Sequence, residues 1–306
     1  MSEIMRFSLY KSKITKYIFG IVLASFIIPM SNAQPPQNIN NFHTASWNSN
    51  GPRWFVVQTL MNLGVDILAI QEAGSLNTIN DQLSSLRNPI PICYDDFEFS
   101  RSVSSDFGFS EYVWTTGGQS FYIYYYHTPV TGSAGGVTKQ NMAIVSRQRA
   151  DEIIILPNQT INTPATAEEA EQDPRNFINR PVLGIRIANS VFFNIHPEPN
   201  RTRNEAQILL NMIQNYMDSY YPNQTWMAMG DFNRTPAQLR PYIPAAGNSR
   251  FINILNTGVN TRVSGELDYA VVGGPSVNQA AINAIVASLL AMTVANPSDH
   301  KPVRFN

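Results

Sequence analysis

Short apolar runs that end directly in acidic, amide or imidazole residues are the feature that most constrains this chain. In the clearest case, the stretch Val65 to Ile70, which is apolar except for Asp66, is followed at once by Gln71 and Glu72. Runs of this length, rich in β-branched residues, predict strands that are buried in a sheet. Further strands are predicted at 121–126, 141–146, 191–195 and 226–229, and a hairpin is predicted at 183–195.

Two segments have the spacing of helices that bury one face. Residues 52–63 begin at a proline and end before Gly64, and residues 203–220 repeat apolar side chains at helical spacing. A third helix is predicted at 279–294. Strands and helices mix without strict alternation, which favours an α/β protein with mixed sheets. No Pro/Gly/Ser-rich linker divides the chain, so we expect a single catalytic domain over 34–306.

Residues 1–33 have the layout of a secretory signal peptide. Four basic residues precede an apolar run at 17–30, and Ser31 and Ala33 supply the small residues of a cleavage site before Gln34. The alternative is an N-terminal membrane anchor, but the run is shorter than the roughly 20 residues that a spanning helix needs. We therefore expect a secreted protein whose mature chain begins at Gln34.

The mature chain would carry a net negative charge. The first 33 residues hold four of the 21 basic and one of the 22 acidic residues, which leaves 17 basic and 21 acidic residues, a net charge of −4. This balance disfavours binding to nucleic acid by bulk charge, so any such contact needs a local basic patch. Cys93 is the only cysteine, which excludes a disulfide within the chain.

The polar residues beside the apolar runs are of the types that hydrolytic sites use. They are Trp47-Asn48, Gln71-Glu72, His196, Gly230 to Arg234, Leu267-Asp268-Tyr269 and Ser298-Asp299-His300. Strand ends can gather such side chains into one pocket. Taken singly, an Asp or Asn after a strand is more often a turn residue, and a single His is more often structural. Their occurrence together, in this order, favours a functional site.

The order of these motifs resembles that of the deoxyribonuclease I-like enzymes, and in finer detail that of the B subunits of cytolethal distending toxins. The matching segments are 66–75, 111–114, 143–152, 180–187, 230–234 and 267–271. The resemblance runs from Phe42 to Phe305. It implies a four-layer α/β sandwich, in which two mixed β-sheets lie face to face and are flanked by helices.

The resemblance also implies hydrolysis of phosphodiester bonds with Mg²⁺, or with Mn²⁺ or Ca²⁺ in its place. Such a reaction needs an activated water, a protonated leaving oxygen and positive charge around the phosphate. The residues implied to act in catalysis are His196, His300, Asp268, Asp231, Asn233 and Asp299. Those implied to bind the substrate phosphate are Arg180, Lys139 and Asn48, and Glu72 is implied to bind the metal. Imidazole titrates near neutral pH, which suits the two histidines to general acid and base catalysis.

Two stretches depart from the toxin family. Residues 139–141 read Lys-Gln-Asn where the family usually has Arg-Val-Asn, and Lys lacks the planar fork with which Arg binds phosphate. Pro197, Glu198 and Pro199 follow His196, where relatives usually have small residues. Both changes affect residues expected to contact the substrate and leave the implied catalytic residues unchanged.

Three functions remain open from the sequence. The first is a DNA-cleaving toxin subunit that is secreted, acts with separate delivery and receptor-binding subunits, and reaches the nucleus of a target cell. The second is a phosphoinositide phosphatase on the same fold. The third is a relative that binds its target without catalysis, which the complete set of site residues disfavours.

Overall fold

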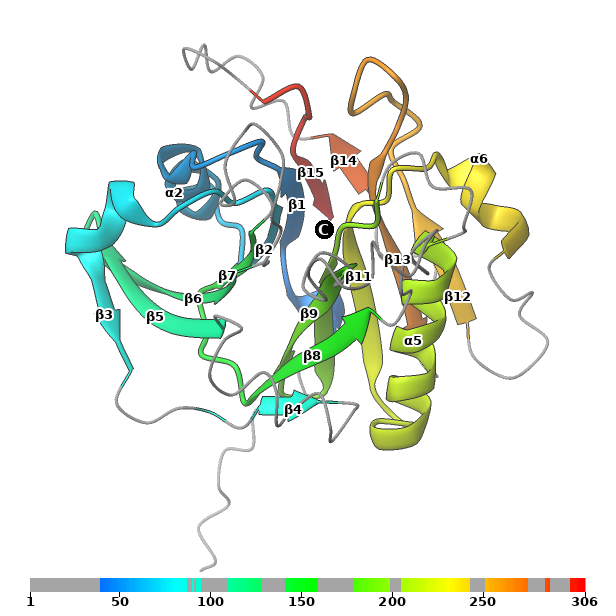
Figure 1. Ribbon diagram of the computed structural model, residues 1–306, viewed down its shortest axis with the longest axis horizontal. Coiled ribbons are helices and arrows are strands. Elements are labelled where there is room, and N and C mark those ends of the chain that lie inside the picture. The colour runs from blue at the N-terminus through cyan, green and yellow to red at the C-terminus, as the bar shows by residue number, and fades with distance from the viewer. Residues whose placement is uncertain are drawn as a thin grey trace, which may run out of the picture. The chain divides into compact units, whose positions relative to one another are not determined.

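Two β-sheets lie face to face and are covered on their outer faces by helices (Figure 1). The computed structural model describes residues 39–86, 90, 92–94, 109–127, 141–158, 179–198, 205–242, 251–274, 284–286 and 298–305. Both sheets contain parallel and antiparallel pairs, so both are mixed. The expected four-layer α/β sandwich is therefore confirmed.

The first sheet has eight strands in the described part of the chain. In spatial order they are β14 (Ala284–Val286), β15 (Val303–Phe305), β1 (Thr44–Asn48), β2 (Ile67–Gln71), β7 (Met142–Ser146), β6 (Gln119–Tyr126), β5 (Phe109–Thr116) and β3 (Leu83–Ser85). The interior strands β1 and β2, third and fourth in this order, form a parallel pair, and Asn48 pairs with Gln71 at its end.

The second sheet has seven strands among the described residues. In spatial order they are β12 (Phe251–Leu255), β13 (Asp268–Gly274), β11 (Thr225–Asp231), β10 (Ser190–Ile195), β9 (Asn179–Ile187), β8 (Glu152–Asn158) and β4 (Ile92–Tyr94). Its central pair, β10 and β11, is also parallel, and Ile195 pairs with Gly230 at its end.

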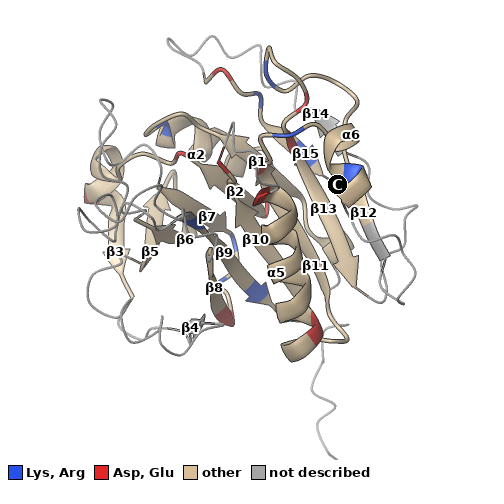
Figure 2. Ribbon diagram, turned by 45° about the vertical axis from the view of Figure 1, so that its right-hand side comes forward, with Lys and Arg blue, Asp and Glu red and all other residues tan. Residues whose placement is uncertain are grey.

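Alternation along the strands builds three apolar layers. In β2, Ile67 and Ala69 face the second sheet, whereas Leu68 and Ile70 join the cluster under the outer helix. Successive strand residues point to opposite faces, and both faces are covered here, so the strands read as continuous apolar runs. Strands β1, β2, β6, β7 and β10 accordingly carry neither acidic nor basic residues and are tan in Figure 2.

The helices bury one side each. Helix α5 (Glu205–Tyr220) places Leu209, Ile213 and Met217, four residues apart, on the outer face of the second sheet. Helix α2 (Trp54–Asn62) does the same on the first sheet. The remaining short elements are η1 (Ile39–Asn41), η2 (Asn77–Gln82), α6 (Pro236–Leu239) and η4 (Arg240–Tyr242). No helix in the described ranges is long and apolar enough to cross a membrane.

The predicted helices at 52–63 and 203–220 and the predicted strands are confirmed to within a few residues. The helix predicted at 279–294 is wrong at 284–286, which form strand β14 and pair with β15. Here pairing of the backbone with a neighbouring strand outweighs weak helical spacing. The rest of that segment and the predicted signal peptide lie outside the described residues.

Candidate active site

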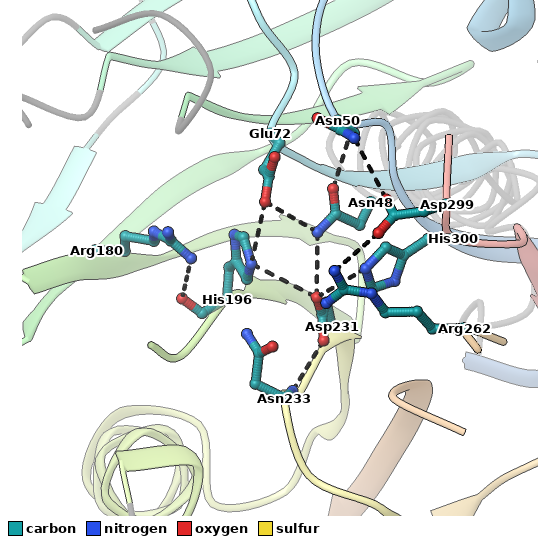
Figure 3. Close-up of a pocket in the computed structure, with 10 residues that line it drawn as sticks. All are labelled: Asn48, Asn50, Glu72, Arg180, His196, Asp231, Asn233, Arg262, Asp299 and His300. Carbon is teal, nitrogen blue, oxygen red and sulfur yellow. Dashed lines mark hydrogen bonds and ion pairs between the residues drawn. The ribbon is translucent and has the colours of Figure 1, made fainter. Parts of the chain in front are cut away.

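A pocket of about 220 Å³ opens where the central strands of both sheets end (Figure 3). Asn48 ends β1, Glu72 follows β2, His196 follows β10 and Asp231 ends β11. Because β1 and β2 run parallel, and so do β10 and β11, the two strands of each pair end at the same edge of their sheet. Both edges border the same pocket. The residues that line the pocket are Asn48, Asn50, Glu72, Arg180, His196, Asp231, Asn233, Arg262, Asp299 and His300.

Two features hold the strand ends together. A Cβ atom on Gly230 would lie 2.0 Å from the Ile195 carbonyl oxygen, so only glycine lets β11 approach β10 this closely. Between the sheets, Gln71 Nε2 donates a hydrogen bond to Asn194 Oδ1 (2.7 Å). This bond ties the residue before Glu72 to a residue two positions before His196.

Asp231 lies at the centre of the polar cluster. Its Oδ2 atom is 3.6 Å from His196 Nε2 and 3.5 Å from His300 Nε2, so the two imidazoles flank one oxygen. Asp231 Oδ1 accepts a hydrogen bond from the backbone N–H of Asn233 (2.8 Å), and Oδ2 accepts one from Asn48 Nδ2 (3.1 Å). Burial, and next the charge of Asp268, raise the pKa of Asp231 to about 7, although His300 and the two donors oppose that rise.

His300 is oriented by a buried carboxylate. Its Nδ1 atom lies 2.7 Å from Asp268 Oδ2, and since a carboxylate only accepts, Nδ1–H is the donor and Nε2 faces the pocket. Burial alone would lower the pKa of His300. The hydrogen bond and charge of Asp268, with the charges of Asp231 and Asp299, outweigh burial and raise that pKa above its usual value.

His196 has a different environment. Burial, followed by the positive charges of Arg180 and His300, lowers the pKa of His196 well below its usual range. Its Nδ1 atom is buried and has no hydrogen-bond partner among the described residues. Arg180 is itself buried, and its Nη1 donates to the His196 carbonyl oxygen (3.3 Å). The arginine therefore lies on the His196 side of the pocket.

Three residues of the pocket have a strained backbone. Asn50, Glu72 and Asn233 have φ values of 48°, 51° and 50°, in the left-handed backbone region that residues other than glycine rarely adopt. Such conformations persist only where surrounding contacts enforce them, and they concentrate at functional sites. The hydrogen bond from Asn50 N to Asn48 Oδ1 (3.1 Å) and the one from Asn233 to Asp231 are two such contacts.

The donor set fits a hard divalent cation. Asn48 Nδ2 donates both to Glu72 Oε1 (3.2 Å) and to Asp231 Oδ2 (3.1 Å), so a single amide lies between two carboxylates. The carboxylate oxygens of Glu72 and Asp231 are of the hard type that Mg²⁺ prefers. Asn48 turns its amide nitrogen toward them, and its Oδ1 accepts a hydrogen bond from Asn50 N (3.1 Å). Asp231, Asp268 and His300 form a second group whose ligand atoms lie within 4.8 Å of one another. In that group the hydrogen bond between His300 Nδ1 and Asp268 Oδ2 already occupies one potential ligand atom of each residue. This favours proton transfer over metal binding.

Nine of the ten predicted site residues lie in or beside the pocket. Eight of them line it, and Asp268 lies directly behind His300. Asp299 lies at the mouth, where Oδ1 accepts from Asn50 Nδ2 (3.3 Å) and Oδ2 pairs with Arg262 Nη2 (2.8 Å). Lys139, the tenth, lies outside the described residues.

The sequence prediction missed Asn50 and Arg262. Asn50 lies two positions after the Trp-Asn motif, so its proximity to a predicted site residue was an available signal. Arg262 lies in the loop between β12 and β13, with no motif of its own, and only the folded loop brings it to the pocket.

Comparison with known proteins places this site in a family. The chain belongs to the Endonuclease/Exonuclease/phosphatase family, whose model matches residues 38–300. Within that family it is a member of the group formed by the B subunits of cytolethal distending toxins. It is 31% identical to the B subunit of the Escherichia coli toxin over 290 residues, which cover 87% of this chain and 91% of the relative. It is 29% identical to a homolog of this B subunit from Salmonella typhi over 280 residues, which cover 88% of this chain and 90% of the relative.

Solved structures agree with this assignment. The structure of CdtB, described as the biologically active subunit of cytolethal distending toxin, matches with a TM-score of 0.65 at 28% identity, covering 87% of this chain and 98% of CdtB. The crystal structure of the Haemophilus ducreyi toxin matches with the same TM-score and identity, covering 88% of this chain and 98% of that chain. Family, fold and site together define a hydrolase that acts on phosphodiester bonds.

Proposed function

We propose that this protein is the catalytic subunit of a toxin of the cytolethal distending type, a secreted Mg²⁺-dependent endonuclease that hydrolyses phosphodiester bonds in DNA. The observation that carries the proposal is the pair of buried histidines on either side of Asp231, with Nε2 distances of 3.6 Å and 3.5 Å. Two imidazoles that face one small pocket can act on both sides of a phosphorus atom.

The histidines divide the proton transfers between them. As water attacks the phosphorus, one Nε2 atom accepts its proton, while the other Nε2 donates a proton to the oxygen whose bond to phosphorus breaks. His300 keeps its Nε2 in the pocket because Asp268 holds Nδ1. The Asp268–His300 pair thus fixes the tautomer, as the carboxylate does in other hydrolases with a carboxylate–histidine pair.

The remaining side chains orient the phosphate and the water. Asn233 lies beside Asp231 and is anchored by the bond from its Nδ2 to the Pro197 carbonyl oxygen (2.7 Å). Arg180 supplies positive charge on the His196 side, where a guanidinium can bind two oxygens of one phosphate. Asp299 would act through Asn50, whose Nδ2 donates a hydrogen bond to Asp299 Oδ1 (3.3 Å).

Glu72 and Asn48 are the residues that would hold Mg²⁺. The Glu72 carboxylate suits an ion that keeps several of its waters. Asn48 would bind the ion through Oδ1 with its amide group turned over, since Nδ2 faces Glu72 here. When bound, the metal supplies positive charge that polarises the phosphate and stabilises the charge that develops on its oxygens. Mn²⁺ and Ca²⁺ accept the same ligand types and are the alternative ions.

Export and delivery complete the proposal. The signal-like residues 1–33 support secretion, and relatives named as subunits support action with separate delivery subunits. The proposed site of action is DNA in the nucleus of a target cell. Because the mature protein is slightly acidic, it would contact DNA through a local group of basic side chains rather than through its net charge.

The test is plasmid nicking by the purified mature protein with Mg²⁺ and then with EDTA, beside phosphate release from a phosphoinositide. Nicking that requires Mg²⁺, with little phosphate release, supports the endonuclease. Phosphate release without nicking would replace it with the phosphoinositide phosphatase. Metal-independent binding without either activity would favour a relative that has lost catalysis.

A further inference from the structure

Arg262 is a cation at the mouth of the pocket, on the side of His300. Its Nη2 atom lies 2.8 Å from Asp299 Oδ2, and Asp299 directly precedes His300 in the chain. The side chains of Arg262 and Asp299 are 39% and 44% exposed, so this ion pair lies in solvent. Figure 3 shows the guanidinium extending from its own loop toward the Asp299 carboxylate.

The loop that carries Arg262 is fixed by internal hydrogen bonds. The backbone N–H groups of Arg262 and Gly265 donate to each other's carbonyl oxygens (3.0 and 3.1 Å). Thr261 Oγ1 accepts from the backbone N–H groups of Leu267 (2.9 Å) and Asp268 (3.0 Å). Because Asp268 also orients His300, the backbone of Arg262 is held in register with the catalytic pair.

The two arginines of the pocket differ in accessibility. Arg180 is 6% exposed and contacts the backbone of His196, deep in the site. Arg262 lies on the opposite, His300 side, and a large part of its side chain remains open to solvent. Arg180 thus lies against His196 deep in the pocket, whereas Arg262 pairs with Asp299 at the solvent-exposed mouth, next to His300.

We propose that Arg262 is a substrate-binding residue that recognises a phosphate next to the scissile one on the same strand, and so favours a polymeric phosphodiester over a small one. This inference rests on the proposed function. Phosphates on one strand repeat about every 3.4 Å along the helix axis, so a second phosphate lies near any phosphate in the pocket. A guanidinium binds two phosphate oxygens in one plane, and an exposed ion pair with Asp299 is weak enough to exchange for that contact.

The experiment compares Arg262→Gln with wild type on two substrates. One is supercoiled plasmid, and the other is bis(4-nitrophenyl) phosphate, a diester without a neighbouring phosphate. Loss of one charge-assisted contact should raise KM for the plasmid by about tenfold with kcat little changed. Hydrolysis of the small diester should be unaffected. Arg262→Lys keeps the charge but not the planar guanidinium, so its KM for the plasmid should lie between those of wild type and Arg262→Gln.

Binding is measured separately, by fluorescence anisotropy on a labelled duplex in EDTA over a range of salt concentrations. Removing one phosphate contact should make the slope of log K against log salt shallower by about 0.9. The control is Arg186→Gln, since Arg186 also pairs with an aspartate, Asp151 (3.6 Å). Arg186 lies by the β9–β10 turn, at the opposite end of β10 from His196. The slope of log K against log salt for Arg186→Gln should therefore equal that of wild type. Thermal melting checks that every variant is folded.

The outcomes separate the inference from the proposed function. Wild-type protein that does not nick plasmid contradicts the proposed function, whereas the anisotropy slope tests Arg262 whether or not cleavage occurs. Wild-type KM and slope in folded Arg262→Gln would overturn the inference and leave the nuclease intact. An equal loss on plasmid and small diester would also overturn it, because Arg262 would then act on the scissile group.

Discussion

His300 Nδ1 lies 2.7 Å from Asp268 Oδ2, and both side chains are buried. The two residues are 32 positions apart. Asp268 begins β13 of the second sheet, and His300 lies in the segment just before β15 of the first sheet. The contact turns His300 Nε2 toward Asp231 at 3.5 Å. A single hydrogen bond between the sheets thus determines which nitrogen of this imidazole can exchange a proton in the pocket.

Replacing Asp268 with Asn should lower both activity and the pKa of His300. The amide keeps the shape but removes the charge that favours imidazolium, so the NMR titration of the His300 ring should move to lower pH. In wild type the raised pKa stabilises the fold below the unfolded value of about 6.5, and this contribution is lost as pH rises through the folded value. The wild-type advantage in unfolding free energy should therefore be larger at about pH 6 than at about pH 9. An unchanged titration midpoint would contradict this role for Asp268.

Replacing Glu72 with Gln should weaken metal binding. The amide preserves the size of the side chain but is a poorer ligand for a hard cation. The Mg²⁺ concentration for half-maximal activity should rise and turnover should fall. A second readout is independent of catalysis: Mg²⁺ should raise the melting temperature of wild type more than that of the variant, because ligand binding stabilises the folded state. Equal Mg²⁺ responses in both assays would show that Glu72 is not a ligand.

Secretion should remove the first 33 residues. A basic stretch, an apolar run and small residues before Gln34 fit a signal peptidase substrate. N-terminal sequencing of exported protein should therefore begin at Gln34. An Ala33→Arg variant, which places a bulky charge at the cleavage site, should remain uncleaved and provides the control. Native exported protein that still begins at Met1 would exclude this assignment.

The sequence predicted the buried strands and their polar ends because both depend on local patterns. Ile67 to Ile70 is apolar throughout since both faces of β2 are covered, and the polar Gln71 and Glu72 follow because the chain there leaves the core. Contacts between segments far apart in the chain carry no such pattern. The Gln71–Asn194 bond joins two sheets across 123 positions.

Loops and edges were the parts that sequence patterns could not resolve. Arg262 reaches the pocket only because hydrogen bonds inside its loop fix the backbone, and no periodicity encodes that path. Residues 284–286 have weak helical spacing but form a strand, because the edge of β15 offers backbone partners. In both cases tertiary contacts decide what the local sequence leaves undetermined.

Replacing either His196 or His300 with Ala should lower the rate without unfolding the protein. General acid–base catalysis typically contributes about 10²–10⁴-fold, and each variant should lose that much in kcat. The double variant should lose less than the product of the single losses, because the two side chains act on one reaction. If the histidines were only structural, activity would fall in proportion to the folded fraction. Specific activity per folded molecule, with the fraction taken from thermal melting, distinguishes these cases.

Replacing Asn194 with Ala should destabilise the whole sandwich. Asn194 Nδ2 donates to the carbonyl oxygens of Ile70 (2.8 Å) and Ala143 (2.9 Å), and Oδ1 accepts from Gln71 Nε2 (2.7 Å). The substitution removes three buried hydrogen bonds, although Gln71 Nε2 keeps its bond to Ser46 Oγ (3.3 Å). An unsatisfied buried neutral group costs about 1–3 kcal/mol. The unfolding free energy from urea denaturation should therefore fall by about 2–4 kcal/mol.

The site should respond to the same change. Gln71 precedes Glu72, and Asn194 lies two residues before His196, so the bond connects the Glu72 side of the pocket with the His196 side. The folded Asn194→Ala protein should lose kcat as well as stability, because small displacements of reacting groups slow catalysis strongly. The matched control is Asn253→Ala in strand β12, the edge strand of the second sheet, which should leave kcat unchanged. If Asn194→Ala lowered stability but kept the wild-type kcat per folded molecule, the bond would support the fold without aligning the site.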